Sequence, residues 1–131
     1  MAFRLYSTDD GHVPAWEYYE CTAIQPQVGQ GMAFNTSGQL VVSATPEFIC
    51  MREEDAPVEA GTKIPVVRIS EDQVWETVLY SDSAAAKVGL VADVDPSCRW
   101  VTAEDMVREV FLITYIEGKT MASPLRGRFV K

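Results

Sequence analysis

The stretch that decides the fold runs from Gly31 to Thr77, GMAFNTSGQLVVSATPEFICMREEDAPVEAGTKIPVVRISEDQVWET. It holds four or five short apolar runs separated by turns rich in glycine, proline and acidic residues. Such runs are typical of antiparallel strands joined by tight turns. Residues 35–38, Asn-Thr-Ser-Gly, predict a hairpin loop that leaves Leu40 and Val42 on the inner face. We therefore expect paired strands here, and nothing in the stretch indicates a catalytic site.

Outside this stretch, strand-like runs continue in both directions. Predicted strands cover 16–24, 32–34, 39–43, 48–51, 62–69, 73–80, 90–94, 100–101, 110–116 and 126–130. Pro65 cannot donate a ladder hydrogen bond, which predicts an edge strand or a bulge. Residues 81–88 and 102–109 predict short helical turns, the first because it joins a serine cap, three alanines and a terminal glycine, the second because it opens on a capping box. The sequence thus predicts a mainly β fold, an antiparallel β-barrel or β-sandwich of about eight to ten short strands with one or two short helices.

Length and composition predict one globular domain. The chain has 131 residues, of which 47% are hydrophobic and 23% charged, which excludes an intrinsically disordered protein. We divide it into a polar N-terminal arm, residues 1–15, and a single β-rich domain, residues 16–131. No apolar run approaches the roughly 20 residues that span a bilayer, so no membrane partner is expected. The N-terminus also lacks the apolar core of a signal peptide, which predicts a protein made and kept in a cytoplasm.

The charge balance argues against nucleic acid as a partner. Nineteen acidic residues against eleven basic ones give a net charge of −8 at pH 7. Binding a phosphate backbone requires a basic stripe, and only the tail 119–131 is locally basic. We therefore expect partners other than DNA or RNA.

Few residues could carry a reaction. His12, the single histidine, lies in a polar turn, and a surface role is expected for it. Asp93 and Asp95 face the same side of a strand end, where they could hold a hard cation or serve ordinary turn chemistry with Pro96 and Ser97. The sequence assigns no catalytic residue, cofactor or metal site.

Acidic clusters offer one test of that conclusion. They occur at 53–55 and 71–72, beside proline or between strands, and predict a solvated rim or a contact with a basic partner. Convergence of Glu53, Glu54, Asp93 and Asp95 in one cleft would instead indicate an enzyme or a ligand-binding module.

Cysteines and tryptophans are expected to pack. Cys21, Cys50 and Cys98 are odd in number and lack a CxxC spacing, which predicts reduced thiols. The sequence also holds three tryptophans, for which core packing is the usual role. Trp16, at the junction of the arm and the first strand of the domain, is the preferred interface anchor among them.

The order of these elements resembles the small head-decoration, or capsid-stabilising, proteins of tailed bacteriophages. The resemblance rests on VGQGMAFNTSGQLVVSA, FICMREEDAPVEAGTKIPVVRISEDQVWET and KVGLVADV, and it covers about residues 22–130. Its hairpin, central strand and later turn correspond to Gly31–Val42, Ala60–Val67 and Val88–Val91. These are structural motifs of glycines and alternating apolar residues, so no catalytic residue is carried over.

The resemblance implies a non-enzymatic virion protein, made in the host cytoplasm, that decorates and stabilises the outside of the capsid. Its expected partners are the major capsid protein and copies of itself, as a homotrimer. Expected contact residues are Phe3, Arg4, Tyr6 and Trp16 toward the shell, and Ile64, Val66 and Val67 near a subunit contact. Alternatives are another phage structural component, such as a tail-tube, head–tail connector or minor capsid protein, or a small β-barrel ligand-binding module.

Overall fold

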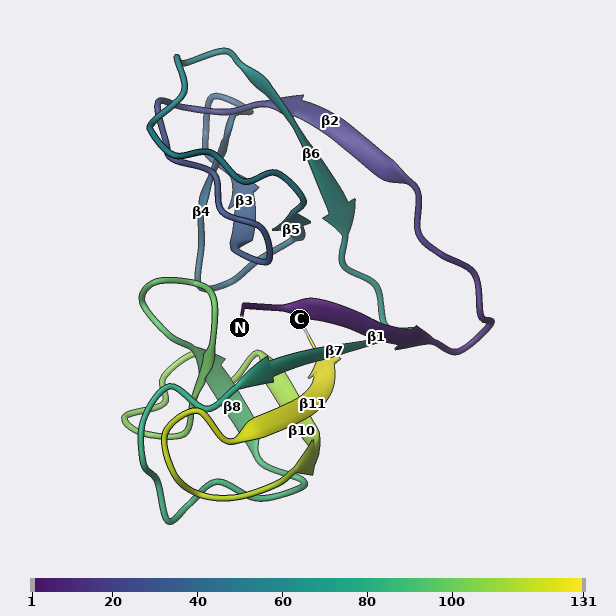
Figure 1. The fold of residues 1–131 in the computed structure, drawn as a ribbon, viewed down its shortest axis with the longest axis vertical. Coiled ribbons are helices and arrows are strands. Elements are labelled where there is room, and N and C mark those ends of the chain that lie inside the picture. The colour runs from purple at the N-terminus through teal and green to yellow at the C-terminus, as the bar shows by residue number, and fades with distance from the viewer. Residues whose placement is uncertain (1, 131) are drawn as a thin grey trace.

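The computed structural model describes residues 2–130, and within them the chain forms eleven strands in two antiparallel sheets (Figure 1). The strands are β1 (Arg4–Thr8), β2 (Trp16–Glu20), β3 (Gly31–Phe34), β4 (Leu40–Val42), β5 (Phe48–Cys50), β6 (Lys63–Arg68), β7 (Gln73–Val78), β8 (Val91–Val94), β9 (Val101–Thr102), β10 (Phe111–Ile116) and β11 (Pro124–Phe129). One sheet has the order β1-β7-β11-β10-β8-β9, and the other β2-β6-β5-β3-β4. The predicted mainly β fold is confirmed.

The two sheets form a sandwich-like arrangement and not a closed barrel. Each sheet ends in edge strands, β1 and β9 in one and β2 and β4 in the other. A single bridge between Leu79 and Val101 curls the larger sheet, but β9 has only two residues and cannot extend that bridge into a ladder. The barrel alternative is therefore wrong, because in residues 2–130 no ladder joins the two edge strands of either sheet.

The hairpin that opens the deciding stretch is confirmed. β3 and β4 pair with Met32 opposite Val42 and Phe34 opposite Leu40. Asn35 organises the loop, since its side-chain oxygen accepts the N–H groups of Ser37 and Gln39. Gly38 takes a positive φ of 79°, a conformation that glycine adopts without strain.

The helical turn predicted at 81–88 does not form. Its carbonyl groups find another donor: the ammonium of Lys119 donates to the oxygens of Ala84 and Ala86, at 2.9 and 2.7 Å. Ser83 does accept the N–H of Ala85, as a cap would, but the bonding stops at this turn. The segment is irregular because a distant side chain takes the groups that a helix needs.

The helix predicted at 102–109 is wrong for the same kind of reason. Thr102 accepts the N–H of Glu104 at 3.3 Å, the start of a capping pattern. The next donors, the N–H groups of residues 107–109, are instead bonded to the carboxylate of Asp93 on β8. Asp105 and Glu109 also have positive φ, which ends any helical path. No helix occurs between residues 2 and 130.

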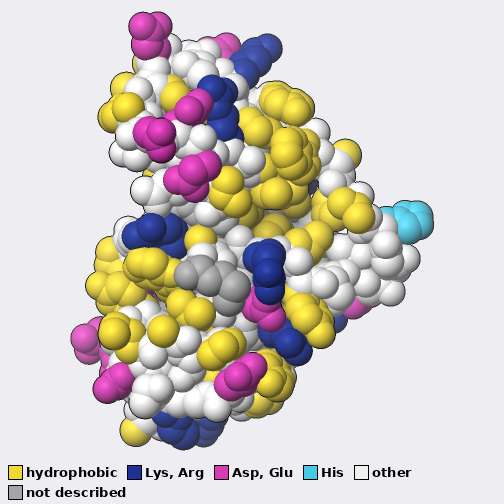
Figure 2. Space-filling view, viewed as in Figure 1, with side chains coloured by type: hydrophobic (Ala, Val, Ile, Leu, Met, Phe, Trp, Pro, Cys, Tyr) yellow, Lys and Arg dark blue, Asp and Glu magenta, His cyan; other side chains and the backbone are white. Residues whose placement is uncertain are grey.

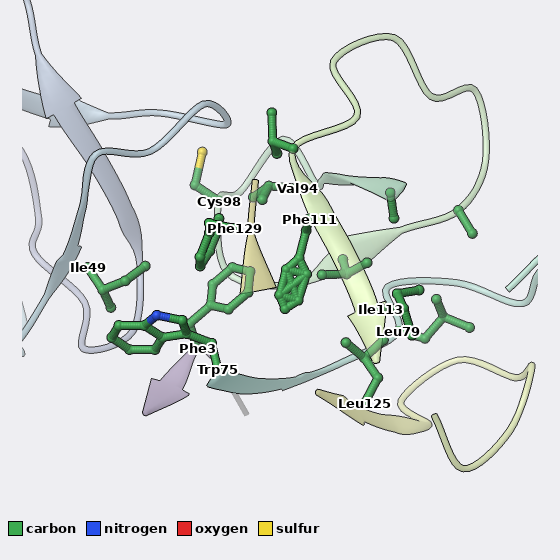
Figure 3. Close-up of a cluster of buried hydrophobic side chains, with 14 of the residues drawn as sticks. Phe3, Ile49, Trp75, Leu79, Val94, Cys98, Phe111, Ile113, Leu125 and Phe129 are labelled. Atoms are coloured by element: carbon green, nitrogen blue, oxygen red, sulfur yellow. The ribbon is translucent and has the colours of Figure 1, made fainter. Parts of the chain in front are cut away.

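A large core fills the space between the two sheets (Figure 3). At its centre the rings of Phe3, Phe111 and Phe129 contact one another, with centroids 5.0 to 5.6 Å apart. Trp75 packs edge-on against Phe129. Complete burial of an aromatic or large aliphatic side chain stabilises the fold by about 2 kcal/mol or more. Phe3 directly precedes β1, so this part of the predicted arm is packed into the core while Arg4–Thr8 pairs with β7.

A second, smaller core lies on the other face of the five-stranded sheet. It contains Cys21, Met32, Leu40, Phe48, Cys50, Ile64 and Val66. β6 serves both cores and is buried on two sides, because Val67 belongs to the large core instead. The predicted edge or bulge position of Pro65 is wrong, since β6 lies between β2 and β5. The proline is accommodated because only its carbonyl is used toward β5, accepting the N–H of Met51 at 3.0 Å.

Candidate functional site

An ion-paired triad lies across three strands of the six-stranded sheet. The strand register places Arg4 and Arg126 directly opposite Glu76, on β1, β11 and β7. The buried carboxylate of Glu76 accepts from Arg4 and, at 3.1 Å, from Nε of Arg126. Hydrogen bonds from Arg4 and then Arg126 hold the pKa of Glu76 below its usual range. Two guanidinium groups share one carboxylate, so the triad carries one excess positive charge in a chain of net −8.

Two tyrosines complete this surface. The guanidinium carbon of Arg126 lies 3.9 Å from the ring centroid of Tyr6 and 4.5 Å from that of Tyr115. Both rings stay open to solvent, Tyr6 at 51% and Tyr115 at 40% exposure. Figure 2 shows dark-blue and magenta side chains together over β7 and β11, with hydrophobic side chains beside them. We call Arg4, Tyr6, Glu76, Tyr115 and Arg126 the arginine–aromatic face.

Irregular strand pairing helps to place both tyrosines. In β1 the register shifts between Leu5 and Ser7, so that Tyr6 is the extra residue. In β10 it shifts between Ile113 and Tyr115, which brings Tyr115 opposite Arg126. Such bulges re-aim side chains and are enriched near functional sites.

A second apolar feature lies on the edge strand of the other sheet. Trp16 and Tyr18 alternate along β2, are 50% and 57% exposed, and face Val67 and Pro65 of β6. In Figure 2 hydrophobic side chains cover β2 and β6 on the same side of the molecule as the arginine–aromatic face. We call Trp16 and Tyr18 the aromatic edge.

A small hollow of about 240 Å³ adjoins Arg4 of the arginine–aromatic face. Its lining is almost wholly apolar and comes from Ala2, Phe3, Arg4, Leu5, Val28, Met51 and Trp75. Val28 at its rim is exposed. Arginine is one of the residue types enriched at protein–protein contacts, and the apolar hollow beside Arg4 could receive a side chain of a partner.

The predicted contact residues fall into two groups. Arg4, Tyr6 and Trp16 are exposed and belong to the arginine–aromatic face or the aromatic edge. The other four are buried inside the chain's own cores, and these are Phe3, Ile64, Val66 and Val67. The sequence analysis missed Glu76, Tyr115 and Arg126. The sequence shows that these residues lie in predicted strands, but it does not show the strand register that brings them together.

The Asp93–Asp95 pair serves the backbone. Asp93 accepts the N–H groups of residues 107, 108 and 109 at 2.9, 2.9 and 2.6 Å. Asp95 accepts those of residues 97, 99 and 100 and the hydroxyl of Ser97. Burial raises the pKa of Asp93, but the three N–H groups outweigh it, so the pKa lies below its ordinary value. The turn role that the sequence left open for Asp95 is confirmed. Among residues 2–130 no three His, Cys, Asp or Glu side chains gather in a way that could hold a metal ion.

Glu53 and Glu54 lie elsewhere, beside the loop that precedes β3. Glu53 accepts the N–H of Val28, and Glu54 pairs with Arg52. Asp93, in contrast, anchors the loop after β9. The carboxylates of Glu53 and Glu54 thus bond to groups in one part of the chain, and those of Asp93 and Asp95 to groups in another. His12 is exposed in the turn between β1 and β2, where its backbone N–H bonds to Asp10.

The three thiols are buried. Cys21 and Cys50 pack in the second core, as predicted, and Cys98 contributes to the large core. Burial raises the pKa of Cys50 and of Cys98 to about 11, so neither is a ready nucleophile. Trp75 packs in the core as the tryptophan pattern predicted.

Comparisons with known proteins give no assignment. No protein-family model matches the chain. Neither a curated protein nor a solved structure matches it significantly. In residues 2–130, no helix long and apolar enough to cross a membrane is found.

Proposed function

We propose that this chain is a non-enzymatic structural protein of a tailed-bacteriophage virion, which decorates and stabilises the outside of the capsid by binding the major capsid protein. The observation that carries the proposal is the arginine–aromatic face. Arg126 is already held by Glu76 and by the rings of Tyr6 and Tyr115 in the unbound chain. A contact surface that is ordered beforehand loses little side-chain entropy on binding.

The use of ionisable groups supports a role without catalysis. The two aspartates of the 93–95 motif are bonded to backbone N–H groups, and the cysteines are buried. Ion pairs elsewhere join strands or stabilise turns, as between Arg68 and Glu17 at 2.8 Å. These groups hold a β scaffold together, which fits a protein that works through its surface.

A capsid presents many identical binding sites, so the affinity of each single contact can be modest. Many copies on one particle multiply weak individual affinities, so a few exposed rings and arginines per copy suffice. In this proposal the chain acts as a homotrimer on the capsid exterior, and the net charge of −8 disfavours binding to DNA.

The test is co-sedimentation with undecorated heads, purified from a deletion mutant that lacks the gene for this chain. We expect the wild-type protein to pellet with the heads and to saturate. Tyr6→Ser and Trp16→Ser remove exposed rings without touching either core, and each should weaken binding about tenfold or more. Val88→Ser, at another exposed apolar residue, is the matched control and should bind as the wild type does.

Two results would overturn the proposal: no binding of the folded wild-type protein, or equal binding by both ring variants and the control. Deleting residues 1–15 is a poorer test. It would remove Phe3 from the core and β1 from the sheet, and so would report on folding.

A further inference from the structure

A second cleft, open to solvent, lies away from the arginine–aromatic face. It has a volume of about 850 Å³, within the roughly 300–1,000 Å³ range of ligand pockets. It forms where the two sheets meet, with Val42 and Ala44 on one wall and Asp93 and Val94 of β8 on the other. Residues 102–108 border it, and none of the five residues of the arginine–aromatic face lines it.

An aromatic stack ends in this cleft. The guanidinium of Arg99 lies 4.2 Å from the ring centroid of Trp100, and Trp100 stacks on Tyr80 at 5.8 Å with an interplanar angle of 22°. Tyr80 lines the cleft and is 44% exposed. One end of the stack therefore has its cation, while the other end presents an open ring, a surface that attracts a second cation.

The walls of the cleft carry a negative charge. Three carboxylates line it, those of Asp93, Glu104 and Asp105, against the single guanidinium of Arg108, which leaves a net charge of −2. Asp93 is occupied by backbone N–H groups. Glu104 and Asp105 are exposed, and neither forms an ion pair within residues 2–130.

Hydrogen bonds to its backbone hold the loop that carries these two carboxylates. Asp93 fixes it through the N–H groups of residues 107–109, and Thr102 accepts the N–H of Glu104. The backbone that carries the two acidic side chains is thus anchored beside the cleft. A preorganised site of this kind binds with little ordering cost.

We propose that this cleft binds an arginine side chain of a protein partner, with the guanidinium stacked on Tyr80 and paired with Glu104 and Asp105. The planar guanidinium can stack on a ring and bond to carboxylates at the same time, whereas the ammonium of lysine is a compact, strongly hydrated charge. The negative walls exclude an anionic ligand. This inference is independent of the proposed function and concerns a different surface.

The test is an NMR titration of the full chain with N-acetyl-arginine N-methylamide, which carries the side chain without charged termini. We expect saturable shifts of the backbone amides at 80–81 and 102–108 and of the Trp100 indole. The citrulline analogue, of the same shape but neutral, and the lysine analogue are the ligand controls. Both should bind at least about threefold more weakly than the arginine probe.

Matched variants locate the contacts. Glu104→Gln with Asp105→Asn should weaken arginine binding about fivefold, and Tyr80→Leu about threefold. Asparagine tolerates the positive φ of residue 105, so the loop keeps its shape. Glu59→Gln with Asp55→Asn, an equal charge change at two exposed sites between β5 and β6, should leave binding unchanged. The proposal is overturned if citrulline or lysine binds as well as arginine, if the shifts fall outside the cleft, or if the acidic double variant binds like the wild type.

Discussion

The substitution Asp93→Asn tests the carboxylate that binds the N–H groups of residues 107–109, where the sequence predicted a helix. The amide has nearly the same shape, but it has no charge and turns one acceptor oxygen into a donor. In the chain, Oδ1 accepts the N–H groups of Arg108 and Glu109, and Oδ2 accepts that of Val107. The least costly orientation keeps Oδ1 in place and points an NH₂ group at the N–H of Val107. The N–H of Val107 then loses its acceptor, and the two remaining bonds lose their charge assistance.

The expected loss can be worked from these three bonds. An unsatisfied donor costs about 1–3 kcal/mol, and the low end applies here because Val107 lies at the surface. Each of the two remaining hydrogen bonds loses about 1 kcal/mol when its acceptor is no longer charged. Together these give about 3 kcal/mol, a large part of the roughly 5–15 kcal/mol that stabilises a domain. With a slope of about 2 kcal/mol per molar urea, the unfolding midpoint should fall by about 1.5 M.

The dependence on pH has a defined sign. The pKa of Asp93 is lower in the folded chain than its ordinary value, so ionised Asp93 stabilises the fold at pH above about 3.9. That contribution is lost as the pH falls through the folded-state pKa. Asparagine does not titrate. The stability difference between wild type and variant should therefore be full at pH 7 and shrink below about pH 4.

Urea unfolding followed by tryptophan fluorescence, at pH 7 and in steps down to pH 3, measures both effects. Glu104→Gln is the control, because it removes one carboxylate charge from an exposed side chain in the loop that Asp93 anchors, and it should change stability by less than about 0.5 kcal/mol. A variant as stable as the wild type at pH 7 would refute the reasoning, as would a difference that does not change with pH.

Three further changes test other parts of the structure. Gly127→Ala should prevent folding or cost about 4 kcal/mol or more, since its Cβ would lie 2.1 Å from the backbone oxygen of Leu112; circular dichroism and urea unfolding report it. Cys50 and Cys98, with pKa values of about 11, should react with a thiol reagent at pH 8 only when the chain unfolds, and rates that do not rise with urea would contradict this. Glu76→Gln should destabilise the fold by about 1 kcal/mol at pH 7, because two arginines then share a neutral amide. Thermal unfolding should show that the stability difference from the wild type disappears as the pH falls through the lowered pKa of Glu76.

Local chemistry made the strands and the 35–38 turn predictable. Alternating apolar residues set the strand faces, and Asn35 bonds within its own loop. The two helix predictions failed where a distant residue competes with local preference. Lys119 is more than thirty positions from the carbonyls it binds, and Asp93 is fourteen to sixteen positions from its N–H partners. A propensity window contains neither partner, so it cannot weigh them.

The candidate site depends on register in the same way. Alternation from the buried Ile113 would turn Tyr115 inward. The register shift after Ile113 instead places Tyr115 opposite Arg126, on the outer face. Neither glycine nor proline lies between the two residues to mark that shift, since Thr114 stands there. Arg4 and Tyr6 could be identified from the sequence as surface residues near the start of the chain. The contact between Tyr115 and Arg126 can be predicted only once the pairing of β10 with β11 is known.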